Sequence, residues 1–152
     1  MAATSTTRTV SRHRPTIPPD RNLVLGVIIA FNVVSTALHY THNYLQIEHY
    51  PPADFATNHT IQIAILISWP VLTVVGVLGL WLYHRGLRPV AYACLIAYST
   101  LGLATLGHFT EGSPHIPVFW YATIFTDALG GLAVLAFIAW SLLTSDQAAA
   151  RR

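Results

Sequence analysis

Two long apolar stretches joined by five residues decide the fold: IQIAILISWPVLTVVGVLGLWLY (61–83), HRGLR (84–88) and PVAYACLIAYSTLGLATLGHF (89–109). Each stretch has the roughly 20 mostly apolar residues that an α-helix needs to cross a ~30 Å hydrocarbon core. Lipid offers the backbone no hydrogen-bond partners, so continuous apolar runs of this length form helices there. Gly86 in the connection and Pro89 just after it favour a tight turn between two membrane helices.

Two further apolar stretches flank this pair, and the expected spans are about 22–43, 60–83, 89–110 and 117–144. The composition agrees, since 53% of the 152 residues are hydrophobic and only 9% are charged. A soluble domain usually has about 25% charged residues. The sequence therefore predicts an all-α, polytopic membrane protein. We expect a four-transmembrane-helix, up-down-up-down bundle that forms one domain over residues 21–145.

The basic residues are confined to segments on one side of the expected membrane. All eight are arginines, and they lie before the first span, in the 84–88 connection and at the end of the chain: Arg8, Arg12, Arg14, Arg21, Arg85, Arg88, Arg151 and Arg152. The positive-inside rule then places both termini in the cytoplasm and leaves 44–59 as an outer loop. We expect residues 1–20 to be a disordered cytoplasmic tail and 146–152 a second cytoplasmic tail. Arginine without lysine is typical of GC-rich bacterial genomes, so the predicted location is a bacterial plasma membrane.

The histidines are concentrated on the opposite side. Six of the eight lie at or near the outer ends of the spans: His39, His42, His49, His59, His108 and His115. Asn32, Thr36, His39 and Asn43 recur at helical spacing and form a polar stripe along one face of the first span. Imidazole and carboxylate groups are the ligands that Zn²⁺, Cu²⁺ and Fe²⁺ use in proteins. The outer half of the bundle is therefore where we expect the chemistry.

Asp127 is the most informative single residue, because it lies ten residues into the fourth span. At ~1.5 Å per residue that is roughly 15 Å along the helix, near the middle of the membrane. An ionisable group at this depth is costly and is a functional candidate by default. We expect His39 and His108 to bind a cofactor, and His39, His42, His108 and Asp127 to supply metal ligands. The sequence does not identify the bound group, for which Zn, Cu, Fe and haem are the candidates.

Three functions fit these residues. The first is an outward-facing His/Asp cluster that binds a transition metal or haem. The second is a small membrane enzyme that acts on a lipid, sterol-like or quinone substrate by His/Asp acid–base chemistry. The third is an accessory subunit of a larger membrane complex, in which the polar stripes are interhelical hydrogen bonds. A metal site needs imidazole nitrogens within ~2.0–2.2 Å of one point, whereas an enzyme needs a lipid-accessible cavity beside Asp127.

The expected partners are the lipid bilayer and either a second copy of the chain or a larger membrane complex. No basic loop could serve as a nucleic-acid surface, and no HExxH, GxSxG or P-loop pattern occurs. Four spans with buried polar residues, Pro51-Pro52 before the second span and Trp69-Pro70 inside it resemble sterol-isomerase-like four-helix membrane domains. The resemblance covers architecture and scattered residues, and no functional position is carried over from it.

Overall fold

A computed structural model of the chain describes residues 20–110 and 112–150. All the elements in this part of the chain are helical, as predicted. They are four α-helices and two short 3₁₀ turns: α1 (Arg21–Leu45), η1 (Ile47–His49), α2 (Asn58–His84), α3 (Arg88–Ala104), η2 (Thr105–Phe109) and α4 (Val118–Ala150). Four helices are long and apolar enough to cross a membrane, α3 together with η2. Apart from residue 20, the predicted tail 1–20 lies outside the described residues, as do 151–152.

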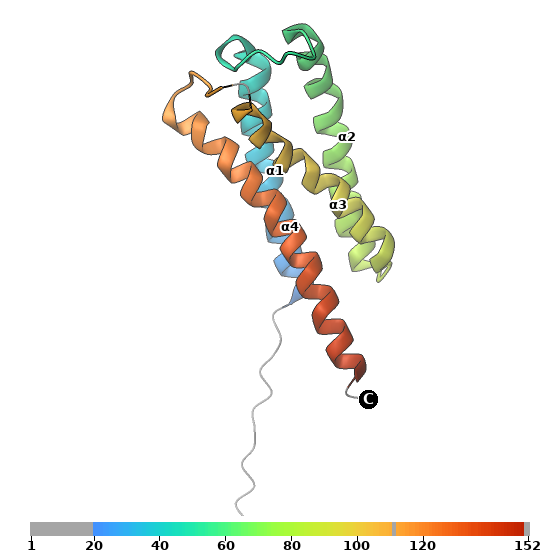
Figure 1. Cartoon of the computed structure of the whole chain (residues 1–152). Helices are drawn as coiled ribbons and strands as arrows, with labels where there is room; N and C mark the ends of the chain where they lie inside the picture. Colours follow the sequence, from blue (N-terminus) through green and yellow to red (C-terminus); the bar gives the residue numbers. More distant parts are fainter. Residues whose placement is uncertain (1–19, 111, 151–152) are drawn as a thin grey trace, which may run out of the picture.

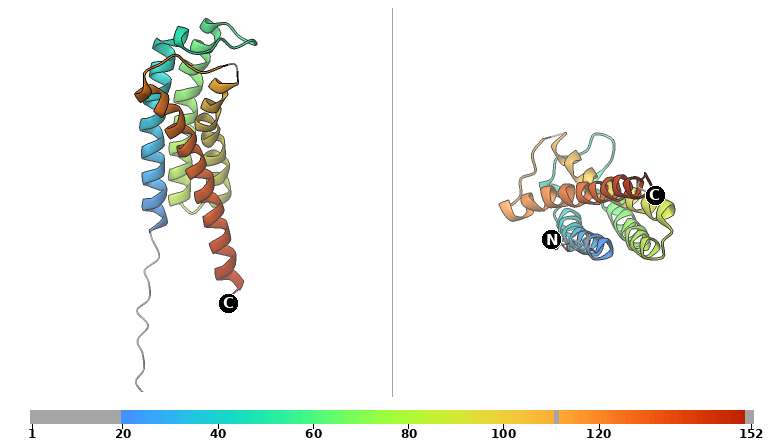
Figure 2. Two further views of the ribbon diagram at one scale, coloured as in Figure 1. Left: turned by 60° about the vertical axis from the view of Figure 1, so that its left-hand side comes forward. Right: turned by 90° about the horizontal axis from the view of Figure 1, so that it is seen from below.

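The four long helices lie side by side, and α4 extends past the others at one end (Figures 1 and 2). In Figure 1, α1 and α3 run in one direction and α2 and α4 in the other. α1 packs against α2 and α4, and α3 packs against the same two helices. We call the end that carries Arg21, Arg85 and Arg88 the arginine end, and the opposite end of the bundle the histidine end.

Local sequence explains where most of the helices begin and end. Asp20 accepts a hydrogen bond from the backbone N–H of Asn22 at 2.9 Å and so caps α1, as its position before the first span suggests. Thr57 caps α2 in the same way. Gly86 has a φ of 77° and makes the turn after α2, and a proline then occupies the first turn of α3.

The third and fourth spans, Arg88–Phe109 and Val118–Thr144, lie close to the predicted ranges, but their ends have features that were not predicted. α3 is α-helical only to Ala104 and then tightens into η2, where the Thr105 hydroxyl donates to the carbonyl of Gly102 at 2.7 Å. A threonine that bonds back onto the preceding turn and a glycine inside η2, Gly107, favour this tighter winding. α4 continues to Ala150, because no proline or glycine follows its apolar part. The predicted tail 146–152 therefore starts inside a helix.

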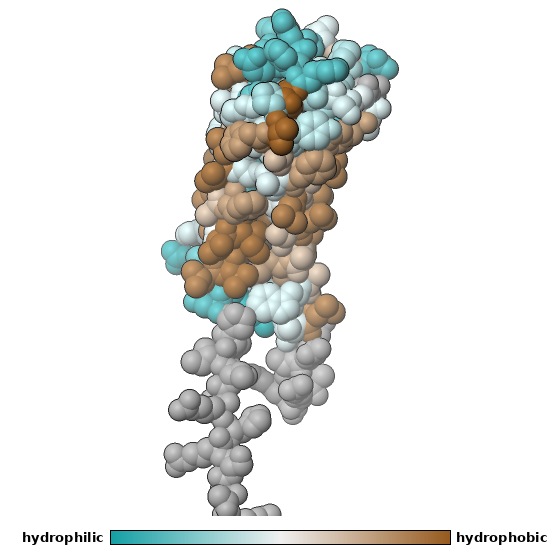
Figure 3. Space-filling view, turned by 90° about the vertical axis from the view of Figure 1, so that its left-hand side faces the viewer, coloured by the Kyte–Doolittle hydropathy of each residue, from teal (hydrophilic) through white to brown (hydrophobic). Residues whose placement is uncertain are grey.

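The outside of the bundle is apolar and the inside is rich in polar groups. Figure 3 shows a hydrophobic band between two hydrophilic ends, and side chains such as Leu23, Val74 and Leu132 are 67%, 66% and 52% exposed. Among the side chains that the structure describes, ten polar ones are buried: Asn32, Ser35, Thr36, His39, Asn43, Ser99, Thr105, Thr123, Asp127 and Ser141. This distribution suits a lipid surrounding rather than water, so the four helices are compatible with an integral membrane protein.

Candidate functional site

His39 of α1 and His108 of η2 lie next to each other near the histidine end. Their ring centroids are 5.3 Å apart. The ring of Tyr50, from the loop after η1, lies 4.7 Å from that of His108 and 6.1 Å from that of His39. Three separate segments of the chain thus bring two imidazoles and a phenol into one cluster, which we call the His39–His108 cluster.

Hydrogen bonds determine which nitrogen of His39 carries its proton. His39 Nδ1 lies 3.3 Å from the hydroxyl oxygen of Thr123. The single hydroxyl proton of Thr123 is donated to the carbonyl of Trp120 at 2.6 Å. Thr123 must therefore accept, so the proton of His39 is on Nδ1. Nε2 is left as a lone pair that is buried and has no hydrogen-bond partner.

His108 is protonated on the same nitrogen, but there the lone pair of Nε2 is the hydrogen-bonded group. Its Nε2 lies 2.9 Å from the side-chain nitrogen of Asn43, and an amide nitrogen can only donate. Nε2 of His108 is therefore the acceptor, and the proton of the neutral ring is on Nδ1. The cluster offers one basic nitrogen, on His39, and one N–H hydrogen-bond donor, on His108.

The other two predicted ligands do not join this pair. Nδ1 of His42 lies 2.9 Å from the hydroxyl of Tyr50, and the ring of His42 stacks on Trp120. Asp127 accepts a hydrogen bond from Ser35. It lies one helical turn deeper than Thr123, the residue that α4 places opposite His39. Within residues 20–110 and 112–150, no three His, Cys, Asp or Glu side chains could together hold a metal ion. The predicted four-ligand metal site therefore finds no support in the structure.

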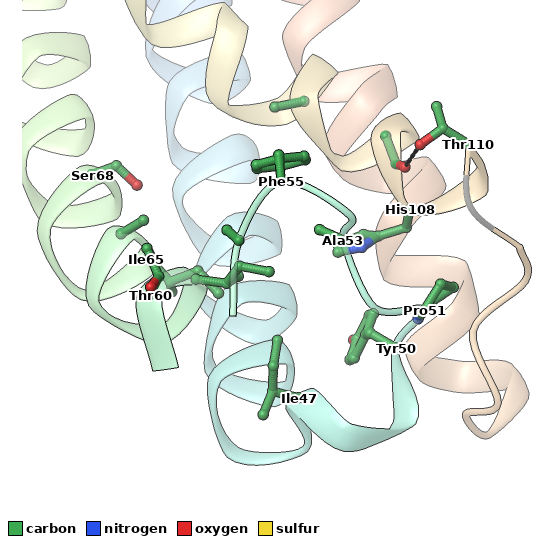
Figure 4. A pocket seen from close by; sticks show the side chains of 15 residues that line it. Ile47, Tyr50, Pro51, Ala53, Phe55, Thr60, Ile65, Ser68, His108 and Thr110 are labelled. Atoms are coloured by element: carbon green, nitrogen blue, oxygen red, sulfur yellow. Dashed lines mark hydrogen bonds between the residues drawn. The ribbon is translucent and has the colours of Figure 1, made fainter. Parts of the chain in front are cut away.

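A cavity of about 570 Å³ opens beside His108. Figure 4 shows Ile65 and Ser68 of α2 on one side of it, with Tyr50 and His108 on the other. Most of the lining is apolar; it includes Ile47, Pro51, Ala53, Phe55, Ile61 and Ala64. A volume between 300 and 1,000 Å³, with apolar walls and few polar groups, is usual for small-molecule sites. We call this cavity the His108 pocket.

Tyr50 closes the pocket on the side of the histidines and is only 5% exposed. Burial raises the pKa of Tyr50 to about 12, and the nearby Asp127 carboxyl contributes to the rise. The phenol therefore keeps its proton at neutral pH and can bond through it. Sequence reasoning did not identify Tyr50 as a site residue, because a loop residue has no helical spacing that would place it.

The remaining histidines of this end lie outside the cluster. His49, His59 and His115 are exposed. The backbone N–H of His115 donates to the carbonyl of His49 at 2.9 Å, which ties together the two loops of the histidine end. His49 and His115 thus hold the loops together through their backbone, and none of the three histidines lines the pocket.

Comparisons with known proteins leave the site to be interpreted from its own chemistry. No family model matches the chain, and neither the curated proteins nor the solved structures include a significant match. The resemblance to sterol-isomerase-like domains gains no support from them.

Proposed function

We propose that this protein binds an amphipathic, mostly apolar molecule in the His108 pocket and exchanges a proton with its polar group. The observation that carries the proposal is the composition of the pocket, whose apolar walls meet the His39–His108 cluster at one side. The arginines at the opposite end favour an outward orientation of this pocket. The ligand would then come from the outer side of the membrane.

The size of the pocket limits the class of ligand. About 570 Å³ is enough for a ring system with a short tail, but not for a whole phospholipid. Quinones and sterol-like molecules have such a ring system and carry one or two oxygens. An oxygen placed near His108 can accept its Nδ1–H, while the apolar body lies against Ile61 and Ile65 of α2.

The chemistry that follows is proton transfer. His108 lines the pocket and is the group that meets the ligand. His39 does not line the pocket, so its unpartnered Nε2 serves as a base within the same cluster rather than as a contact to the ligand. An N–H donor that holds the ligand's oxygen and a base in the same cluster are suited to taking up a proton from the ligand's polar group on Nε2 of His39 and returning it.

The test is binding of two probes, ubiquinone-1 and cholesteryl hemisuccinate, to the detergent-purified chain. We expect at least one probe to raise the thermal unfolding midpoint of the wild type. The shift should be lost in Ala64→Trp, which fills the pocket, and reduced in His108→Ala. Ala93→Trp is the control, because it adds the same side chain at an exposed position of α3 that does not line the pocket. An equal shift in Ala64→Trp, or no shift with either probe, would contradict the proposal.

A bound transition metal or haem is the second candidate, and one observation favours it. The two rings lie 5.3 Å apart between centroids, and they could hold one ion through Nε2 of His39 and Nδ1 of His108 once Nδ1 of His108 has lost its proton. Elemental analysis and an absorption spectrum of the protein purified without chelators decide between the candidates. One equivalent of metal or a Soret band, absent in His39→Ala, would favour this candidate over the apolar ligand.

A further inference from the structure

A second group of polar side chains lies deeper in the bundle, away from the His108 pocket. α1 contributes Asn32 and Ser35, α3 contributes Tyr98 and α4 contributes Asp127. Asn32, Tyr98 and Asp127 are fully buried, and Ser35 is only 6% exposed. None of the four lines the His108 pocket. We call them the Asp127 cluster.

The members of the Asp127 cluster meet across the helix interfaces. Ser35 donates to Oδ1 of Asp127. One turn deeper on the same two helices, Asn32 packs against Gly130, where an added methyl group would lie 2.6 Å from Asn32 Oδ1. The ring of Tyr98 lies against Gly76 of α2.

Half of the polar side-chain atoms in this cluster have no hydrogen-bond partner. The hydroxyl of Tyr98 faces Thr36 of α1. The unpartnered atoms are Oδ2 of Asp127 and both side-chain polar atoms of Asn32, and all are buried. Such atoms are rare in folded proteins, because each loses its hydration without compensation. Their concentration on neighbouring turns of α1 and α4, next to one carboxyl group, points to a ligand that bonds to oxygen.

We propose that the Asp127 cluster binds a monovalent cation, with sodium preferred. The available ligand atoms are oxygens from a carboxylate, an amide and two hydroxyls, and hard cations prefer oxygen. One carboxylate balances one positive charge, whereas a divalent ion would leave an uncompensated charge inside the bundle. The described arginines, Arg21, Arg85 and Arg88, lie at the arginine end, too far along the helices to neutralise Asp127.

The polar stripe of α1 extends from this site towards the histidine end. His39 Nε2 and Asn43 Oδ1 are also buried without partners, so the unpartnered atoms continue from Asn32 to Asn43. These eleven positions correspond to about 16 Å along the helix at ~1.5 Å per residue. The ion would pass these polar groups between the histidine end and the cluster.

The test is direct binding of ²²Na⁺ to the full chain in detergent, at constant ionic strength set with N-methyl-D-glucamine chloride. We expect one sodium ion per chain, displaced by excess unlabelled sodium and more weakly by potassium. Asp127→Asn should abolish binding, since it removes the only charge of the cluster. Gly130→Ala should weaken binding about tenfold, because the added methyl displaces Asn32 Oδ1 and leaves the carboxylate in place.

Two controls make the outcome decisive. Asp54→Asn removes one negative charge from the exposed loop and should bind sodium as the wild type does. His108→Ala should also keep sodium binding, so that failure of this proposal and failure of the His108 pocket are distinguishable. If circular dichroism shows that Asp127→Asn does not fold, the comparison of sodium binding by the wild type and by Gly130→Ala decides the outcome. Absence of displaceable ²²Na⁺ in the wild type, or unchanged affinity in Gly130→Ala, would overturn the proposal.

Discussion

Buried polar side chains near the arginine end bond to one another, whereas several polar atoms in the middle of the bundle and towards the histidine end have no partner. At the arginine end, the hydroxyls of Tyr83 and Tyr92 both bond to the hydroxyl of Ser141, at 3.2 and 2.8 Å. Among the described side chains, the unpartnered buried atoms include polar atoms of Asn32, His39, Asn43, Thr73 and Asp127. The first pattern is hydrogen bonding that joins helices. The second leaves donors and acceptors available for a ligand, which distinguishes a candidate site from packing.

The largest effect is expected in the histidine half, where α3 and α4 approach most closely. A methyl group at Gly102 would overlap the backbone carbonyl of Asp127, which cannot move without shifting α4. We expect Gly102→Ala to lower the free energy of unfolding by about 3 kcal/mol, measured by denaturant titration in detergent. Gly79→Ala, in the arginine half, meets only side chains such as Leu95 and should change it by less than about 1 kcal/mol. Equal losses would show that both halves are packed equally tightly.

The second largest effect compares a buried hydroxyl that has partners, Ser141, with a buried amide that has none, Asn32. Ser141→Ala leaves two buried phenols without their shared partner and should cost about 1–3 kcal/mol. Asn32→Leu in sodium-free buffer should be neutral or stabilising, because neither polar atom of that amide has a partner to lose. Denaturant titration of both variants gives the comparison. If Asn32→Leu lowered the free energy of unfolding as much as Ser141→Ala, Asn32 would be a residue that stabilises the fold and not one available to a ligand.

A smaller effect concerns the proton of His39. Thr123→Val keeps the shape of the side chain but removes the acceptor for Nδ1–H, at an expected cost of about 1 kcal/mol. ¹⁵N NMR of histidine-labelled protein should show Nδ1 of His39 protonated in the wild type and a redistribution towards Nε2–H in the variant. Thr144→Val, on the same helix in the arginine half, should leave the His39 signals unchanged. A wild-type spectrum with the proton on Nε2 would refute the proposed base.

The smallest effect is in the ionisation of Tyr50. Burial raises its pKa from 10.0 to about 12, with a contribution from Asp127. The phenol binds its proton more tightly in the folded chain, so its contribution to stability is full below about pH 10 and is lost as the pH rises to about 12. Tyrosinate absorbance of the wild type minus that of Tyr50→Phe should show a midpoint near the higher value. A midpoint near 10 would place Tyr50 in water and open the pocket on that side.

The sequence was sufficient for the helices and for their polar faces. Apolar runs long enough to cross a bilayer specify four helices, and Asp20 and Gly86 mark two of the boundaries. Helical spacing placed Asn32, Thr36, His39 and Asn43 on one face, and all four are buried. Periodicity of this kind is a local property, so one sequence is enough to detect it.

The contacts between helices could not be predicted from helical spacing. Whether His39 meets Thr123 or Asp127 depends on how far α1 and α4 slide along each other, and a shift of one turn exchanges the partners. Tyr50 reaches the cluster from a loop, and η2 changes the winding just before His108. The position of each proton follows only from hydrogen bonds that these contacts create.

The short α3 has a consequence for the membrane around the protein. Its α-helical part has 17 residues and α2 has 27, which corresponds to roughly 26 and 40 Å at ~1.5 Å per residue. The His108 pocket opens where α3 gives way to η2 beside the longer helix. With the four helices across a bilayer, this mouth would lie near the boundary of a ~30 Å hydrocarbon core. Lipids with longer acyl chains would surround the pocket mouth with hydrocarbon, and shorter ones would expose it to water. If the pocket binds a ligand as proposed, the thickness of the bilayer would then help determine which molecules can reach His108.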